Sequence, residues 1–394
     1  MTFAPFADAH IQHFGYQPKH GDAVFKELTA AAFEAAENEV TSWEGYAKTP
    51  LYHLQGIARE VGVADILYKD ESQRFTLRSF KASGGAYAVL RLLQRELTKK
   101  LGIAVKTADI LSGKYTEHTA EFTIVASTDG NHGRSVAWGT RRCGANCRIY
   151  ISTDVSEGRA ESMRALGATI VRTEGGYSKS AQRVRSDAEE YGWYLANDTA
   201  TPGFEVIPGD ILAGYGLMAR EITRELLEPP THVFLQAAVG GMAAAVASVL
   251  VQHWGNRAPR VVVMETEHAA NLLLSAQRGE ATEVEVVVET IMGGLSCGEF
   301  STTAWNILSE VAQDFMTVPD SVVAPAMRLL AKTPFGDPKI EGGETGVASL
   351  CAALCAATQD DLRKKLGITK ESRILVFGSE GITDPEIYAS IVTD

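Results

Sequence analysis

Lys81 is the residue whose surroundings in the sequence first suggest covalent chemistry. It lies in SFKASGG, residues 79–85, among small residues and directly before an apolar helical pattern. Burial in such a setting favours the neutral amine, which is the form that attacks a carbonyl carbon to make a Schiff base. A solvated lysine at a helix start is the simpler interpretation of this segment taken alone. Its meaning therefore depends on partners elsewhere in the chain.

Three further loops carry residues that could complete such a site. In STDGNHG, residues 127–133, Asp129 is a candidate acid or base, and the backbone N–H groups suit a carboxylate or phosphate. A capped turn is an equally good interpretation of that loop. Gly240 and Gly241 separate an apolar strand from an Ala-rich helix, which suits a phosphate, although tight packing is an alternative. Ser379 ends the last apolar strand.

The elements that must position these loops alternate between strand and helix. Apolar runs predict strands at 121–126, 147–152, 168–173, 193–196, 232–238, 260–266 and 373–379. The predicted helices cover 131–143, 156–166, a stretch ending at 191, 211–227 and 240–254. Such alternation predicts a parallel sheet whose carboxyl edge gathers the loops. The Pro/Gly-rich stretch 199–210 is a candidate crossing between subdomains.

Composition and charge exclude several classes of protein. The 394 residues include 49 acidic and 37 basic side chains, a formal charge of −12, and this argues against a nucleic-acid-binding protein. No stretch is apolar enough to span a membrane, and the N-terminus does not resemble a signal peptide. Five scattered cysteines favour a reducing compartment, so we expect a cytoplasmic protein. We expect no metal site, because the cysteine pairs are poorly spaced for zinc.

Taken together and in this order, the loops resemble the pyridoxal-phosphate enzymes of the tryptophan-synthase-β type, fold type II. More narrowly, the sequence is similar to the diaminopropionate ammonia-lyases, from about residue 40 to the C-terminus. The phrases that carry the resemblance are KDESQRFTLRSFK (69–81), TDGNHGRSVAW (128–138), NDTA (197–200), MGGLSCGE (292–299) and SEGITD (379–384).

The resemblance implies an α/β fold with two open, twisted, mostly parallel sheet domains. Helices would cover both faces of each sheet, and the cofactor would lie between the domains. Residues 1–84 and 200–394 would form the large cofactor-binding domain. Residues 85–199 would form a smaller inserted βα domain. A homodimer is the family expectation.

The resemblance also assigns roles to individual residues. Lys81 would carry pyridoxal 5′-phosphate as a Schiff base and, as the released amine, take or return the substrate Cα proton. Asn131 would hydrogen-bond the 3′-oxygen of the cofactor, and Ser379 would meet its pyridine nitrogen. The residues that would cradle the 5′-phosphate are Val239, Gly240 and Gly241. Those that would hold the substrate carboxylate are Ser127, Thr128, Asp129 and Gly130.

Two acids would complete the chemistry that the resemblance implies. Asp129 would be a second base on the face opposite Lys81, so that one site could take the Cα proton from either enantiomer. Asp198, in NDTA, would hold the distal ammonium of the substrate. The sequence departs from the family at Thr201–Phe204, where Trp-Glu-Gly-Tyr is usual, and this leaves the β-substituent open.

The expected activity is α,β-elimination of 2,3-diaminopropionate, in one or both enantiomers, to pyruvate and ammonia. The alternatives are a dehydratase acting on serine or threonine-type amino acids and, from another class, a non-catalytic ligand-binding homologue. An NAD-dependent oxidoreductase has little support, because the GxGxxG fingerprint is missing. The only partner expected besides a second copy is a small amino-acid substrate.

Overall fold

The computed structural model describes residues 2–19, 21–128 and 130–393, and its strands form two sheets. The larger sheet has the order β1-β10-β9-β8-β11-β3-β2. Its five inner strands, from β10 to β3, are parallel, whereas the two edge strands are antiparallel to their neighbours. The strand bounds are β1 His13–Gly15, β2 Leu51–His53, β3 Asp65–Asp70, β8 His232–Gln236, β9 Arg260–Thr266, β10 Ala312–Val318 and β11 Arg373–Gly378.

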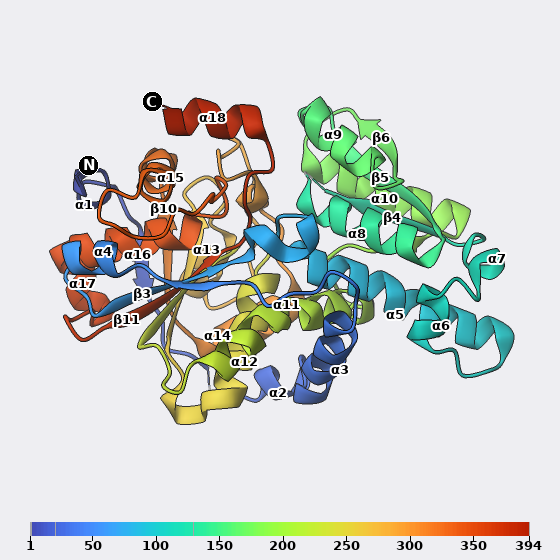
Figure 1. Ribbon diagram of the computed structural model, residues 1–394, viewed down its shortest axis with the longest axis horizontal. Helices are drawn as coiled ribbons and strands as arrows, with labels where there is room; N and C mark the ends of the chain where they lie inside the picture. The colour runs from blue at the N-terminus through green and yellow to red at the C-terminus, as the bar shows by residue number, and fades with distance from the viewer. Residues whose placement is uncertain (1, 20, 129, 394) are drawn as a thin grey trace.

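The smaller sheet has the order β6-β5-β4-β7 and is parallel throughout. Its strands are β4 Thr123–Ser127, β5 Asn146–Ser152, β6 Thr169–Thr173 and β7 Tyr194–Leu195. The crossover helices are α8 Asn131–Cys143, α9 Glu157–Arg164 and α10 Tyr177–Tyr191. This sheet and its helices, in green, form a separate body beside the larger sheet (Figure 1).

Two long helices connect the bodies. Helix α5 spans Lys81–Leu101 and packs against both α8 and α11, Val206–Glu225. Glycine allows the close approach: a Cβ on Gly139 of α8 would lie 2.6 Å from the Cα of Ala86, and one on Gly214 would lie 2.5 Å from the carbonyl oxygen of Ser83. Helix α5 thus runs from the middle of the molecule under the smaller body (Figure 1).

Apolar helices cover both faces of the larger sheet. One face packs against α11, α12 Gly241–Trp254 and α14 Thr302–Val311. The other packs against α16 Ala348–Thr358 and α15 Val323–Lys332. Because α12 and α16 are apolar on most sides, they are almost fully buried. The two-sided cover explains why the parallel strands are continuous apolar runs.

The predicted α/β fold of two mostly parallel sheets is confirmed. Every strand predicted from an apolar run is present, and α8 has the predicted bounds. Helix α11 begins at Val206 instead of residue 211, because Pro208 lies in its first turn, where no intrahelical N–H is needed. The strands of the two sheets fall on either side of the expected domain boundaries, 84/85 and 199/200, but α5 crosses the first. The domain division stays a prediction.

The remaining helices and 3-10 turns are short or peripheral. They are α1 Ala4–Ala7, α2 Ala23–Lys26, α3 Ala30–Thr41, α4 Gln55–Glu60, η1 Glu71–Thr76, α6 Thr107–Leu111, α7 Thr116–Thr119, η2 Gly255–Arg257, α13 Asn271–Arg278, η3 Gly293–Leu295, η4 Asp320–Val322, α17 Asp360–Leu366 and α18 Pro385–Thr393. Within the described ranges, no helix has both the length and the apolar character needed to cross a bilayer.

Candidate active site

A pocket lies between the two bodies, where loops from both sheets meet. Its lining comes from the segments 79–81, 127–128, 130–134, 236–242, 291–297, 344–345 and 379–383, together with side chains of α9 and α10 and Asp198. All the predicted site residues that the structure describes line it: Lys81, Ser127, Thr128, Gly130, Asn131, Asp198, Val239, Gly240, Gly241 and Ser379. Asp129 lies outside the described residues. The topology has therefore brought the four loops together.

The loop that carries Lys81 is fixed to the end of β11. The backbone N–H of Phe80 donates to the carbonyl of Ser379 at 3.0 Å, and the backbones of Ser79 and Glu380 form an isolated antiparallel β-bridge. The Ser79 hydroxyl oxygen accepts a hydrogen bond from the backbone N–H of Lys81 at 3.3 Å. The predicted Schiff-base lysine and the predicted partner of the pyridine nitrogen are thus held in register by the main chain.

The chain before Lys81 is strained and is anchored by a buried ion cluster. Phe75, Thr76 and Arg78 have φ values of 49°, 62° and 59°, in the left-handed region that non-glycine residues rarely adopt. Next to them, the fully buried guanidinium of Arg74 donates to Glu71 at 2.8 Å and to Glu221 of α11 at 2.7 Å. The cluster therefore ties the segment before Lys81 to α11.

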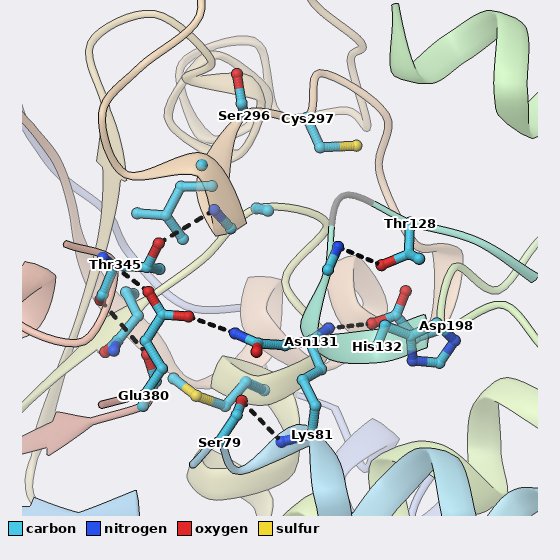
Figure 2. Close-up of a pocket in the computed structure, with 18 of the residues that line it drawn as sticks. Ser79, Lys81, Thr128, Asn131, His132, Asp198, Ser296, Cys297, Thr345 and Glu380 are labelled. Atoms are coloured by element: carbon cyan, nitrogen blue, oxygen red, sulfur yellow. Dashed lines mark hydrogen bonds and ion pairs between the residues drawn. The ribbon is translucent and has the colours of Figure 1, made fainter. Parts of the chain in front are cut away.

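The amine of Lys81 points to the carboxylate of Asp198 and donates a hydrogen bond to it (Figure 2). The Tyr215 hydroxyl donates to the same Oδ2 atom at 3.2 Å. Burial disfavours the ionised carboxyl, but the positive charge of Lys81 and the two hydrogen bonds outweigh it, so the pKa of Asp198 lies below its usual range. Asp198 is therefore a permanent anion beside the amine.

His132 lies against this pair without a charge of its own. It is buried, and its Nε2 is hydrogen-bonded to the carbonyl of Ala196. Burial holds the pKa of His132 below its ordinary value, and its Nδ1 has no partner among the described residues. The ring thus supplies an unused acceptor close to Asp198 and Lys81.

Hydrogen bonds hold the described residues of the loop that is predicted to bind a carboxylate. The Thr128 hydroxyl oxygen accepts from the backbone N–H groups of Gly130 at 3.0 Å and Gly133 at 3.3 Å. The Asn197 side chain binds Ser127 twice, accepting from its N–H and donating to its hydroxyl, each at 3.1 Å. Asn197 precedes Asp198, so the same strand end fixes both the loop and the acid.

The glycine turn after β8 forms a cradle with free backbone donors. Gly240 has a φ of 92°, and a Cβ there would lie 3.1 Å from the Cβ of Ala304. Helix α12 starts at Gly241, and no side chain caps its first N–H groups. An uncapped helix start facing a pocket binds an anion such as phosphate. The structure therefore supports tight packing and anion binding together at this turn.

The opposite wall carries Asn131 and Ser379, together with Glu380, Thr345 and Gln236, for which the sequence predicted no role. The Asn131 amide donates to the carboxylate of Glu380, which also accepts from the backbone N–H of Thr345 at 3.1 Å (Figure 2). The Ser379 hydroxyl donates to the carbonyl of Thr345 at 3.4 Å. Gln236, at the end of β8, leaves its Oε1 buried without a partner among the described residues.

Several site residues were missed from the sequence for identifiable reasons. Tyr215 lies on an apolar helix, where it is indistinguishable from a core aromatic. Arg159 lies on a polar helix, α9, among other charges. Glu344 and Glu380 did carry a signal, because each is an acid beside glycines, in EGGETG and SEGITD.

The comparisons with known proteins agree with this geometry. The family model described as "Pyridoxal-phosphate dependent enzyme" matches residues 43–380. The diaminopropionate ammonia-lyase of Escherichia coli K12 is 35% identical over 356 residues, which are 88% of either chain. The chain belongs to the diaminopropionate ammonia-lyase family.

Solved structures of the E. coli diaminopropionate ammonia-lyase match along almost the whole chain. The complex with D-serine has a TM-score of 0.86 and 31% identity, covering 98% of this chain and 97% of the other. The complex with an aminoacrylate-PLP azomethine reaction intermediate has a TM-score of 0.85 and 32% identity, with the same coverage. The chain is thus a fold type II enzyme, and pyridoxal 5′-phosphate is its cofactor.

The residues in the pocket fit this cofactor. The Lys81 amine can bind its aldehyde carbon, the uncapped start of α12 can take its phosphate, and the Ser379 hydroxyl and Gln236 carbonyl offer neutral partners to its ring. Among the residues described, no group of histidine, cysteine, aspartate and glutamate side chains could hold a metal ion.

Proposed function

We propose that the protein catalyses the α,β-elimination of 2,3-diaminopropionate to pyruvate and ammonia. The observation that carries the proposal is the Lys81 amine, which lies beside an ionised acid in a pocket that also contains a phosphate cradle. Membership of the diaminopropionate ammonia-lyase family supports the substrate. When bound, the cofactor supplies an electron sink for the pair left behind at the substrate Cα.

Lys81 is the proposed holder of the cofactor and the base for the Cα proton. Once the substrate amine has replaced it, the freed Nζ stays near the Cα because Phe80 and Ser79 fix its backbone. Asp198 has a lowered pKa and does not store the proton itself. It stabilises the charged amine electrostatically, and the Tyr215 hydroxyl orients the carboxylate.

The other assignments remain proposals with structural support. Ser127, Thr128 and Gly130 would hold the substrate carboxylate, and Asn197 fixes Ser127 by two hydrogen bonds. Asn131 would orient the cofactor oxygen, with Glu380 fixing its amide. Ser379 is a neutral partner for the ring nitrogen, which weakens the electron sink and favours prompt expulsion of the β-substituent. The proposed phosphate residues are Val239, Gly240 and Gly241.

Asp129 is the proposed second base. It follows Thr128 in the carboxylate loop, and an acid there would take the Cα proton from the enantiomer whose proton faces away from Lys81. One site would then eliminate from both D- and L-2,3-diaminopropionate.

A dehydratase acting on hydroxy amino acids is the second candidate, because the chain has Thr201–Phe204 where the family has Trp-Glu-Gly-Tyr. This turn follows Asp198 and is closed by an isolated antiparallel β-bridge between the backbones of Thr201 and Phe204. The ratio of ammonia to 2-oxo acid, measured with each substrate, separates the two functions. Efficient turnover of 2,3-diaminopropionate, with two ammonia per pyruvate, is the expected result. Turnover of serine or threonine alone, with one ammonia per 2-oxo acid, would replace the proposal with a dehydratase.

We further propose that the protein acts as a cytoplasmic homodimer. Its few cysteines suit a reducing compartment, and four of the five are buried. Sedimentation of the holoenzyme gives the oligomeric state, and a monomer at micromolar concentration would contradict the dimer.

A further inference from the structure

Glu344 is a buried carboxylate in the pocket that the proposed mechanism does not use. It lines the pocket and is only 4% exposed. Among the described residues, the only hydrogen-bond donor to its carboxylate is its own backbone N–H. A carboxylate buried without a partner is costly, so one that opens into a ligand pocket indicates a cationic ligand group.

The other two carboxylates of the described pocket are already engaged. Asp198, to which the family resemblance assigns the distal ammonium of the substrate, already binds Lys81 and Tyr215. Glu380 binds Asn131 and the backbone of Thr345. They lie at opposite sides of the pocket, with Lys81 and Asn131 between them (Figure 2). Glu344 precedes Thr345 on the Glu380 side, so its position is independent of the lysine–aspartate pair.

The backbone at Glu344 is held from two directions. The Thr345 N–H donates to Glu380, which follows β11, and the Thr345 hydroxyl oxygen accepts from the N–H of Gly294 at 3.1 Å. Glu344 is therefore fixed between the end of β11 and the turn at 293–295.

Arg159, a cation with no ion-pair partner among the described residues, reaches the same place from the smaller body. A Cβ on Gly130 would lie 3.7 Å from its Cδ, and one on Gly293 would lie 3.5 Å from its Nη1. Its guanidinium forms no ion pair or hydrogen bond with a described residue. Its positive charge nevertheless lowers the pKa of both the Glu344 and the Glu380 carboxyl, against the raising effect of burial. Arg159 thus reaches from the proposed carboxylate loop at Gly130 to the turn beside Glu344.

A cation and an anion that face one pocket and have no ion-pair partner among the described residues match a ligand with both charges. The α-carboxylate of the substrate would lie at Gly130 and Arg159, and a second ammonium would lie farther along, at Glu344. An amino acid without a second ammonium would leave Glu344 buried and unpartnered. Arg159 and Glu344 together therefore discriminate a diamino acid from a hydroxy amino acid.

We propose that Glu344 binds the β-ammonium group of the substrate and keeps it protonated until the Cβ–N bond breaks. This inference rests on the proposed function. When the base removes the Cα proton, the electron pair forms the Cα–Cβ double bond. The electrons of the Cβ–N bond leave with nitrogen, which departs as neutral ammonia with the three hydrogens it carried. A deprotonated β-amine would have to leave as an amide ion, which is a far worse leaving group.

Glu344→Gln tests this in the holoenzyme, because glutamine keeps the shape and removes the charge. We expect kcat/KM for 2,3-diaminopropionate to fall by ~100-fold, the scale for losing one partner of a buried charge pair. Elimination of chloride from β-chloroalanine, which has no second ammonium, should change by less than about threefold in the same variant. Glu341→Gln, an exposed acid three residues away, is the matched control and should leave both reactions unchanged.

The outcomes separate this inference from the proposed function. Equal losses for both substrates, or no loss for either, would overturn the role of Glu344 while wild-type turnover of the diamino acid still supports the proposed function. A wild-type enzyme that eliminates chloride but not ammonia would overturn both. If Glu344→Gln changes the cofactor absorption spectrum, Glu344→Asp keeps the charge and should lose activity only on the diamino acid. An equal loss in Glu344→Asp on both substrates would also contradict the proposal.

Discussion

The amine of Lys81, at the start of α5, donates a hydrogen bond to the carboxylate of Asp198, which follows β7 of the smaller sheet. The two residues are 117 positions apart in the chain. The pair joins the end of the smaller sheet to the loop that is fixed to β11 of the larger one. Because the pKa of Asp198 is lowered, this contact is an ion pair throughout the neutral range whenever the amine is protonated.

Asp198→Asn should lower kcat by about 10²-fold, because the amide cannot stabilise the charged amine after proton transfer. Stopped-flow absorption of the holoenzyme with substrate measures the step directly. Tyr215→Phe removes only the 3.2 Å hydrogen bond to the same oxygen and should cost less than about tenfold. Equal losses in the two variants would show that the carboxylate charge is unimportant.

Asp129→Asn should reduce activity on one enantiomer of 2,3-diaminopropionate by about 10²–10⁴-fold, the usual contribution of a general base. The other enantiomer, whose proton goes to Lys81, should be nearly unaffected. Steady-state rates with the separate enantiomers check this. Similar losses for both would contradict the two-base proposal.

The pH dependence of the wild-type enzyme should depend on the leaving group. Burial raises the pKa of the Glu344 carboxyl above its ordinary value, and the attraction of Arg159 only partly opposes this. Since an ammonium binds the ionised form, kcat/KM for 2,3-diaminopropionate should rise with pH through that raised pKa. Glu344→Gln should lack this acid limb, as should wild-type elimination from β-chloroalanine. Superimposable acid limbs in the variant and the wild type would refute the assignment.

The buried cluster around Arg74 should contribute strongly to stability. Arg74→Met leaves the carboxylates of Glu71 and Glu221 without their main partner and should lower the free energy of unfolding in urea by about 3–5 kcal/mol. The exposed pair Arg257–Glu228 offers a control, because Arg257→Met should cost less than about 1 kcal/mol. Comparable losses in the two variants would contradict the role of the cluster.

The same cluster predicts a pH dependence of stability. Burial would raise the pKa of Glu221, but the charges and hydrogen bonds of Arg74 and Lys69 outweigh it and lower the pKa. The contribution of ionised Glu221 to the free energy of unfolding is therefore complete above the ordinary pKa of glutamate. It is lost as the pH falls through the lowered pKa of Glu221 in the folded protein. The difference between wild type and Arg74→Met should shrink in acid. If the stability difference between wild type and Arg74→Met grew as the pH fell, the lowered pKa of Glu221 would be contradicted.

The sequence predicted the parts of the fold that repeat a pattern. The strand–helix alternation from 121 to 266 located β4 to β9 and α8, because each strand is a buried apolar run. The edge strands β1 and β2 have three residues each and mixed burial, so no period could reveal them. Strand β3 was not predicted because its sequence, DILYKD, contains three charged residues and yet is entirely buried. Its Lys69 forms an ion pair with Glu221 of α11, which the sequence pattern does not show.

The site was predictable where a loop has a recognisable composition. Lys81, Asn131, Gly240 and Ser379 each lie in a distinctive turn and line one pocket. Arg159 and Tyr215 lie on helices where they look like ordinary surface and core residues, so only the fold shows their part in the site. The glycine-rich turn around Glu344 marks the acid but not its surroundings. A sequence pattern cannot show that a carboxylate lacks a partner, since that depends on what the fold brings near it.

The attachment of the cofactor is the most direct test of this account. Purified holoenzyme should be yellow, and borohydride reduction should bleach it and fix the cofactor on a single lysine as a secondary amine. Mass spectrometry of the proteolytic peptides should place this label on Lys81. Label on Lys69 or another lysine, or a colourless protein that takes up no pyridoxal 5′-phosphate, would contradict the proposed role of Lys81.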